Sequence, residues 1–140
     1  MKHTTRNVTE TEKLGEKIAA KLRGGEVVLL FGELGSGKTA FTRGLIRHFL
    51  PGIRVLSPTF IIVRHYKPGK NYIKNIYHVD LYRVSSEKEI ESVGFTEYLF
   101  KPSTIIVVEW PDLLDFSNKK NVITVWFKKK NIEERIIEIK

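Results

Sequence analysis

One stretch near the N-terminus limits the folds open to this chain more than any other. Residues 27–31 are five consecutive large apolar residues, which is typical of a strand buried on both faces of a parallel sheet. The next eight residues, 32–39, match the pattern G-x-x-x-x-G-K-[ST] of a phosphate-binding loop. An amphipathic helical pattern then begins and ends at Pro51-Gly52. The order strand, loop, helix predicts an α/β fold that binds phosphate.

The residue types in this loop suit that chemistry. Gly32, Gly35 and Gly37 permit positive φ angles and a close approach of the backbone to an anion. Successive backbone N–H groups and the start of the helix can then face phosphate oxygens. Lys38 is predicted to reach the β- and γ-phosphates, and the Thr39 hydroxyl to ligate Mg²⁺. We expect a nucleoside triphosphate to be bound by Gly32, Glu33, Leu34, Gly35, Ser36, Gly37, Lys38, Thr39 and Ala40.

Composition sets wider limits. A chain of 140 residues with 41% hydrophobic and 29% charged residues is expected to form one domain, 1–140. It has no cysteine, so disulfides and thiolate chemistry are excluded, and we expect a cytoplasmic protein without membrane contact. The net charge of +8 fits a polyanionic partner such as RNA, but it equally fits a solvated lysine-rich surface.

Periodicity and turn residues predict the remaining elements. Thr9 and Glu12 form a capping-box pattern that opens a helix over 10–23, which Gly24-Gly25 ends. A second capping box opens a helix over 86–94, and 97–100 form a helical turn. Apolar or alternating runs predict strands at 53–56, 61–63, 72–80, 104–108, 122–127 and 135–139. The expected fold is a P-loop NTPase-like domain, with a central mixed sheet flanked by helices and added antiparallel strands.

Two acidic residues follow apolar strands. Glu109 is predicted to be the Walker B acid, which holds Mg²⁺ or its water; the alternative is an ordinary carboxylate at a strand end. Asp80 is predicted to orient the attacking water or to act as an outer ligand of Mg²⁺; the alternative is an Asp that caps a turn. Thr59, after Ser57-Pro58, could sense the γ-phosphate through its hydroxyl or could be a plain strand residue.

The sequence allows more than one role for several other polar and aromatic residues. His78 can be a buried structural histidine, since one histidine without partner ligands does not make a metal site. Trp110 and Trp126 are expected to be packing residues. Arg83 can face phosphate or pair with Asp80 or Glu87. The chain lacks the guanine-reading pattern Asn-Lys-x-Asp, which favours ATP over GTP.

These segments together resemble a known family. The loop 32–39 is followed in order by Ser57-Pro58-Thr59-Phe60, His78-x-Asp80-Leu81-Tyr82-Arg83, Gly94-Phe95-x-Glu97-Tyr98-Leu99 and Glu109-Trp110-Pro111. This set is similar to the TsaE (YjeE) family, the small ATPases of bacterial tRNA threonylcarbamoyladenosine synthesis, and the similarity covers nearly the whole chain. Glu33, Ser36 and Ala40 depart mildly from the family pattern, and none of these departures removes a phosphate or Mg²⁺ ligand.

The resemblance implies a weak Mg²⁺-dependent ATPase that is stimulated by partner proteins. It implies that ATP turnover resets a complex of TsaD and TsaB, so that tRNA is contacted indirectly. By position it implies catalytic roles for Lys38, Asp80 and Glu109, Mg²⁺ ligation by Thr39 and Glu109, and a place near the nucleotide for Thr59 and Trp110. We expect the free chain to be a monomer. The alternatives are a small-molecule kinase and a non-catalytic, nucleotide-gated RNA-binding module.

Overall fold

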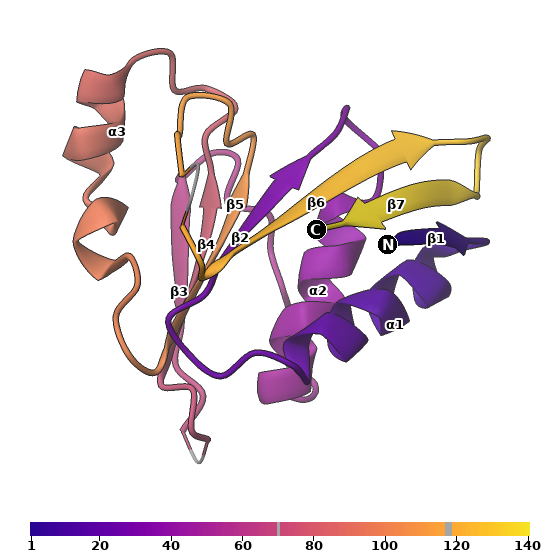
Figure 1. Ribbon diagram of the computed structural model, residues 1–140, viewed down its shortest axis with the longest axis horizontal. Helices are drawn as coiled ribbons and strands as arrows, with labels where there is room; N and C mark the ends of the chain where they lie inside the picture. The colour runs from indigo at the N-terminus through magenta and orange to yellow at the C-terminus, as the bar shows by residue number, and fades with distance from the viewer. Residues whose placement is uncertain (70, 117–118) are drawn as a thin grey trace.

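The fold is built on one mixed β-sheet of seven strands (Figure 1). A computed structural model describes residues 1–69, 71–116 and 119–140. The strand order is β1-β7-β6-β2-β5-β4-β3. The neighbours among β6, β2, β5 and β4 are parallel, whereas β1, β7 and β3 are attached antiparallel. The strands are β1 (Lys2–Thr5), β2 (Val27–Phe31), β3 (Val63–Tyr66), β4 (Asn75–Asp80), β5 (Thr104–Glu109), β6 (Val122–Lys129) and β7 (Arg135–Ile139).

Helices cover both faces of this sheet. They are α1 (Val8–Ala19), α2 (Lys38–Phe49), α3 (Glu87–Val93) and the 3-10 turn η1 (Phe95–Tyr98). Figure 1 shows α1 and α2 together on one side and α3 on the other. Along β2, Val28 and Leu30 pack into the core with α1 and α2, whereas Val27 and Leu29 pack into the core with α3 and η1. The prediction of a strand buried on both faces is confirmed, and so is the α/β fold with a mixed sheet and added antiparallel strands.

The first helix begins earlier than predicted. Its N-cap is Asn7, whose Oδ1 accepts a hydrogen bond from Glu10 N at 2.9 Å, and Glu10 Oε1 accepts from Arg6 N at 2.8 Å. The arrangement is close to a capping box two residues before the predicted one, except that Glu10 accepts from the residue before the N-cap and not from the N-cap itself. The prediction of Thr9 as N-cap was therefore wrong, and α1 covers 8–19 rather than 10–23. For the helix predicted over 86–94 the N-cap Ser86 and the end at Gly94 are confirmed, because Ser86 Oγ accepts from Glu89 N at 3.3 Å and Gly94 ends α3; the Glu89 carboxylate accepts from Ser85 Oγ at 2.9 Å.

Two of the predicted strands differ most from the structure, while the strand predicted at 72–80 begins only at Asn75 and the strand predicted at 122–127 extends to Lys129. Residues 53–56 form a loop, in which Ile53 and Val55 pack into the core beside α2 without pairing to any strand of the described sheet. The alternating apolar residues that predicted a strand here are thus buried in the core, but their backbone forms no β-ladder. The strand predicted at 61–63 starts only at Val63, because Ile62 has φ +71° and lies in a turn. The edge strand β1 was not predicted; it pairs only with β7, from the far end of the chain.

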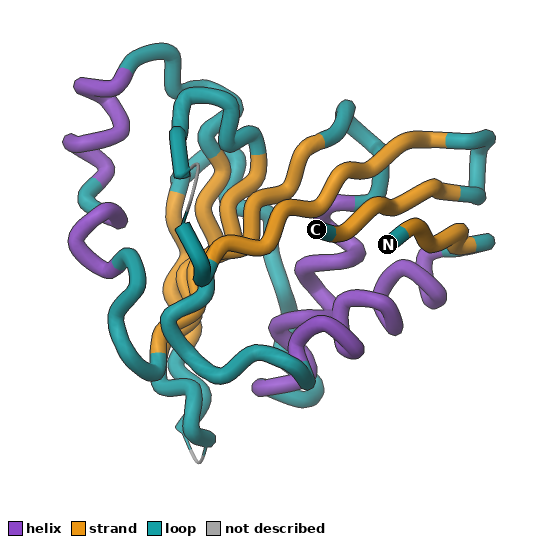
Figure 2. Tube along the Cα trace, in the orientation of Figure 1, coloured by secondary structure: helices purple, strands orange, loops and turns teal. Residues whose placement is uncertain are grey.

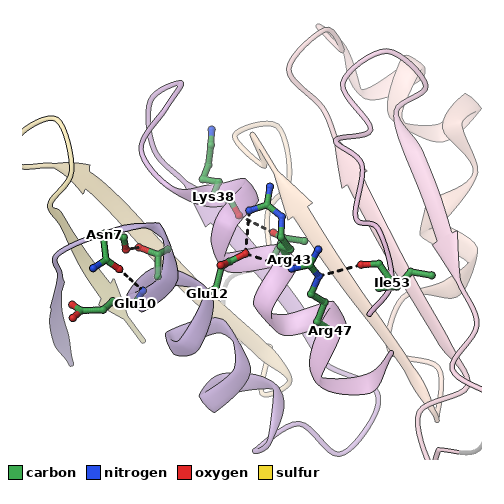
Figure 3. A network of polar contacts seen from close by, with 9 residues as sticks. Asn7, Glu10, Glu12, Lys38, Arg43, Arg47 and Ile53 are labelled. Carbon is green, nitrogen blue, oxygen red and sulfur yellow. Dashed lines mark hydrogen bonds and ion pairs between the residues drawn. The ribbon is translucent and has the colours of Figure 1, made fainter. Parts of the chain in front are cut away.

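Helices α1 and α2 pack backbone against backbone. A Cβ on Gly44 of α2 would overlap the carbonyl group of Glu12, and a Cβ on Gly15 of α1 would overlap the carbonyl of Phe41. Figure 3 shows the polar contacts beside this crossing, where Glu12 accepts from Arg43 at 3.2 Å and Arg47 Nε donates to the Ile53 carbonyl at 3.1 Å. Such part-exposed ion pairs contribute about 0–1 kcal/mol, so the close backbone contact dominates.

The substitution Gly44→Ala is expected to lower the free energy of unfolding by about 2 kcal/mol. Alanine improves helix propensity by about 1 kcal/mol, but forcing two packed backbones apart costs about 3 kcal/mol or more. Urea denaturation measures the difference. Gly69→Ala is the control, because its Cβ would meet no atom within 4 Å, and its change should stay within about 0.5 kcal/mol. Equal stability of the two variants would contradict the close packing.

Within the described residues, none of the helices combines the length and hydropathy needed to cross a lipid bilayer.

Candidate functional site

The loop between β2 and α2 forms an anion-binding turn at the carboxyl end of the central strand. Figure 2 shows it as the teal segment that leads from β2 into the helix. Gly35 and Gly37 have φ +75° and +110°, which a side chain would strain, as the glycine pattern predicted. Gly37 is the N-cap of α2, and none of the backbone N–H groups from 37 to 40 donates to a carbonyl of the described chain. The open end of a helix with its dipole favours phosphate here.

Lys38 is held inside this turn. Its side chain is only 4% exposed, and its Nζ donates a hydrogen bond to the Gly32 carbonyl at 2.6 Å. The same ammonium lies 3.5 Å from the centre of the Trp110 ring, a cation–π contact. Burial lowers the pKa of Lys38 from its ordinary value, while the negative charges of Glu109, Asp80 and Asp112 act in the opposite direction. The Lys38 ammonium is thus partly desolvated, and three acids lie near enough to act on its charge.

The two predicted acids lie side by side at the ends of β4 and β5. The parallel register pairs Asp80 directly with Glu109, and both side chains are buried, at 4% and 3% exposure. Asp80 Oδ2 accepts from Thr59 Oγ1 at 2.9 Å, and Asp80 Oδ1 accepts from the backbone N–H of Tyr82 at 2.9 Å. Asp80 therefore caps a turn, as one of its two interpretations predicted, and it borders the same hollow as the loop 32–39. Its role toward water or Mg²⁺ stays a prediction.

These groups border one hollow of about 320 Å³. Its lining contains most of the predicted site residues: Leu34, Gly35, Gly37, Lys38, Thr39, Ala40, Thr59, Asp80 and Glu109, together with Val8, Ser57, Trp110 and Arg135. Gly32, Glu33 and Ser36 do not line it. Gly32 and Glu33 act through their carbonyls, which accept from Lys38 Nζ and Ser36 N.

The donor set of this hollow fits a magnesium ion. Carboxylate and hydroxyl oxygens are the ligands that Mg²⁺ prefers, usually together with phosphate oxygens and water. Glu109 and Thr39 supply a carboxylate and a hydroxyl beside the anion-binding turn, and Asp80 adds a second carboxylate. Two buried carboxylates side by side repel each other, so a bound cation would stabilise them.

Reasoning from the residues alone gave no site role to Trp110, Arg135 or His78. Trp110 was interpreted as packing, although its family resemblance placed it near the nucleotide; its ring lies against Lys38 and, at 4.9 Å, against the ring of Tyr82. Arg135 Nη2 donates to the Gly35 carbonyl at 2.9 Å and so supports the loop from β7. His78 Nε2 lies 2.6 Å from Glu109 Oε2, within hydrogen-bond distance.

Two other interpretations are settled by contacts. Arg83 lies with its guanidinium 4.7 Å from the centre of the Phe60 ring, and in the described chain it pairs with neither Asp80 nor Glu87. It does not line the hollow. Trp126 stacks on Phe31 at 5.8 Å, as expected of a packing residue.

A second hollow, of about 270 Å³, adjoins the first. The two share Val8, Gly37, Ala40 and Arg135 in their linings. The second is otherwise bordered by the start of α1 and the turn between β6 and β7, through Asn7, Thr9, Thr11, Ile132 and Glu133. Neither segment carries a nucleotide-binding motif, so no local pattern in the sequence could have identified these residues as part of the site.

Known proteins match this chain in sequence and structure over nearly its whole length. The family model described as "Threonylcarbamoyl adenosine biosynthesis protein TsaE" matches residues 5–137. The chain is 36% identical to tRNA threonylcarbamoyladenosine biosynthesis protein TsaE of Rickettsia prowazekii, over 98% of this chain and 92% of the relative. It is 34% identical to the protein of that name from Bacillus subtilis, over 98% and 83%. The crystal structure of YdiB from Bacillus subtilis matches with a TM-score of 0.75 and 30% identity, over 98% of this chain and 82% of that one. The chain belongs to the TsaE family of tRNA threonylcarbamoyladenosine biosynthesis proteins.

Proposed function

We propose that this protein is a weak Mg²⁺-dependent ATPase whose turnover resets a TsaD–TsaB complex during tRNA threonylcarbamoyladenosine synthesis. One observation carries the ATPase part: the anion-binding turn, Lys38 and the acids Asp80 and Glu109 all border one hollow. Two buried carboxylates repel a bound anion, and the single positive charge of Lys38 offsets only one of them, so a divalent cation would be needed to hold phosphate beside both.

In this proposal the nucleotide lies across both hollows. The free N–H groups from 37 to 40 and Lys38 hold the phosphates of ATP. The nucleoside occupies the second hollow, where the exposed apolar side chains of Val8 and Ile132 offer contact area to a flat base. Because the two linings share Ala40 and Arg135, one molecule can fill both.

Hydrolysis in this site needs an oriented water and a neutralised γ-phosphate. Thr39 and Glu109 would hold Mg²⁺, which supplies charge neutralisation for the phosphates when bound. Asp80 would hold the attacking water by accepting its hydrogen bond, with Thr59 positioning the carboxylate. The water oxygen forms the new bond to the γ-phosphorus while its proton passes to Asp80. The bond from the γ-phosphorus to the bridging oxygen of the β-phosphate breaks, ADP leaves, and the proton passes from Asp80 to inorganic phosphate.

The family's pathway, tRNA threonylcarbamoyladenosine biosynthesis, supports the proposed partners and location. TsaD and TsaB would be bound as proteins and tRNA contacted through them, with the free chain a monomer in the cytoplasm. The test is ATP hydrolysis by the chain with and without the TsaD–TsaB pair from the same organism. We expect stimulation by the pair and its loss in Glu109→Ala. Equal rates with and without the pair would contradict the reset function, and phosphorylation of an added nucleoside or alcohol would identify a kinase instead.

A further inference from the structure

His78 contacts Glu109, the residue to which the proposed function gives the magnesium-holding carboxylate. Its imidazole is completely buried, at 0% exposure, and its Nε2 lies 2.6 Å from Glu109 Oε2. We propose that His78 is a positioning residue: it donates Nε2–H to Oε2, fixes the Glu109 side chain and leaves Oε1 for the cation. This inference rests on the proposed function, because it concerns how Glu109 is presented to Mg²⁺.

The sheet register explains why this pair forms. In the parallel ladder of β4 and β5, Asp80 is level with Glu109, and His78 is level with Val107. Side chains two residues apart on a strand share a face, so His78 and Asp80 both lie on the face of Val107, which packs into the core beside α2. His78 thus lies on the same face of the sheet as the two acids, two residues before Asp80 along β4, and its ring can reach a Glu109 oxygen on the neighbouring strand.

The hydrogen-bond partners determine which nitrogen carries the proton. An ionised carboxylate can only accept, so Nε2 is the donor. Nδ1 is buried and has no partner in the described chain. A buried N–H without an acceptor costs about 1–3 kcal/mol, so the tautomer with its proton on Nε2 fits the surroundings. The ring therefore offers Glu109 one donor in one direction.

This bond matters because a glutamate side chain has several rotamers. A buried carboxylate that lacks a donor can turn away from a ligand or lose charge. Among the hydrogen bonds of the described residues, the Glu109 carboxylate receives only the one from His78. Partners that orient metal ligands in this way typically contribute 10- to 100-fold to metal affinity or activity. A histidine that merely filled the core would not affect Mg²⁺ at all.

The experiment compares His78→Leu, which removes the donor, with His78→Gln, whose Nε2 is the same number of bonds from the backbone. Calorimetry measures the affinity for a non-hydrolysable ATP analogue with Mg²⁺ and with EDTA. We expect His78→Leu to reduce the affinity gained from Mg²⁺ by about 10-fold or more, with the EDTA value unchanged. His78→Gln should restore most of that gain. His65→Leu, which removes an exposed histidine on β3, is the matched control and should leave the gain unchanged.

Three outcomes would overturn the proposal. His78→Leu could keep the wild-type increase in affinity that Mg²⁺ produces, or His78→Leu and His78→Gln could lose equal amounts of that increase. The third is a further loss of the increase when His78→Leu is added to Glu109→Ala. A Glu109→Ala variant that keeps the full gain would instead remove the proposed role of Glu109 itself. If His78→Leu does not fold, ¹⁵N NMR of the wild-type imidazole decides. The Nε2–H signal should move when Mg²⁺ is added to the nucleotide-bound protein, and an unmoved signal contradicts the proposal.

Discussion

Replacing Lys38 by alanine should weaken ATP binding by about 100-fold. The ammonium is expected to contact two phosphates, and each charge-assisted hydrogen bond contributes about 1.5–3 kcal/mol, where 1.4 kcal/mol is tenfold in affinity. No other basic side chain among the described residues of the hollow is free to replace it. Among the described residues of the hollow, the second positive charge is Arg135, whose Nη1 and Nη2 already donate to backbone carbonyls, including those of Asn131 and Gly35.

Calorimetric titration with ATP measures this loss, and inorganic triphosphate should lose affinity to a similar extent because the lysine serves the phosphates and not the base. Lys129→Ala removes the same charge from an exposed position on β6 and is the control. Melting curves must show that Lys38→Ala is folded. An ATP affinity within about threefold of the wild-type value would contradict the assigned role of Lys38.

The part of the site that could be predicted is the part encoded locally. The strand 27–31, the loop 32–39 and the following helix are consecutive, so their order and glycine positions determined the geometry of the turn. Asp80 and Glu109 were predicted to lie in the site because each ends a buried strand, and parallel strands bring their carboxyl ends to one edge. Their catalytic and metal-binding roles stay predictions.

The contacts that could not be predicted depend on pairing between distant segments. Arg135 reaches Gly35 across 100 residues, because β7 follows β6 and β6 pairs with β2. The His78–Glu109 bond depends on the register of β4 against β5, and a shift by one residue would turn His78 to the other face. The same reason explains β1, whose few residues become a strand only beside β7. Local pattern determined which residues are chemically suited to the site, and tertiary pairing determined their partners.

The second large effect is expected for Asp80→Asn, which should bind ATP within about threefold of wild type but hydrolyse it about 100-fold more slowly or worse. General-base and orienting groups contribute about 10²–10⁴-fold to rate. The substitution suits the geometry. Asparagine keeps the carbonyl oxygen that can accept from Tyr82 N, and the Thr59 hydroxyl can turn to accept from the new amide. The turn is retained, and the ability to accept the proton of an attacking water is lost.

Single-turnover hydrolysis with the TsaD–TsaB pair present separates binding from chemistry. Asp112→Asn is the control, because Asp112 acts on the charge of Lys38 but does not line the hollow. Equal rate losses in the two variants would attribute the effect to the electrostatic environment of Lys38 alone. A wild-type rate in Asp80→Asn would leave Asp80 with the turn-capping role that its bond to Tyr82 N already shows. The orienting acid would then have to be Glu109, the other buried carboxylate of the described hollow. Since one Glu109 oxygen already contacts His78, its remaining oxygen could not both accept a hydrogen bond from the water and ligate Mg²⁺.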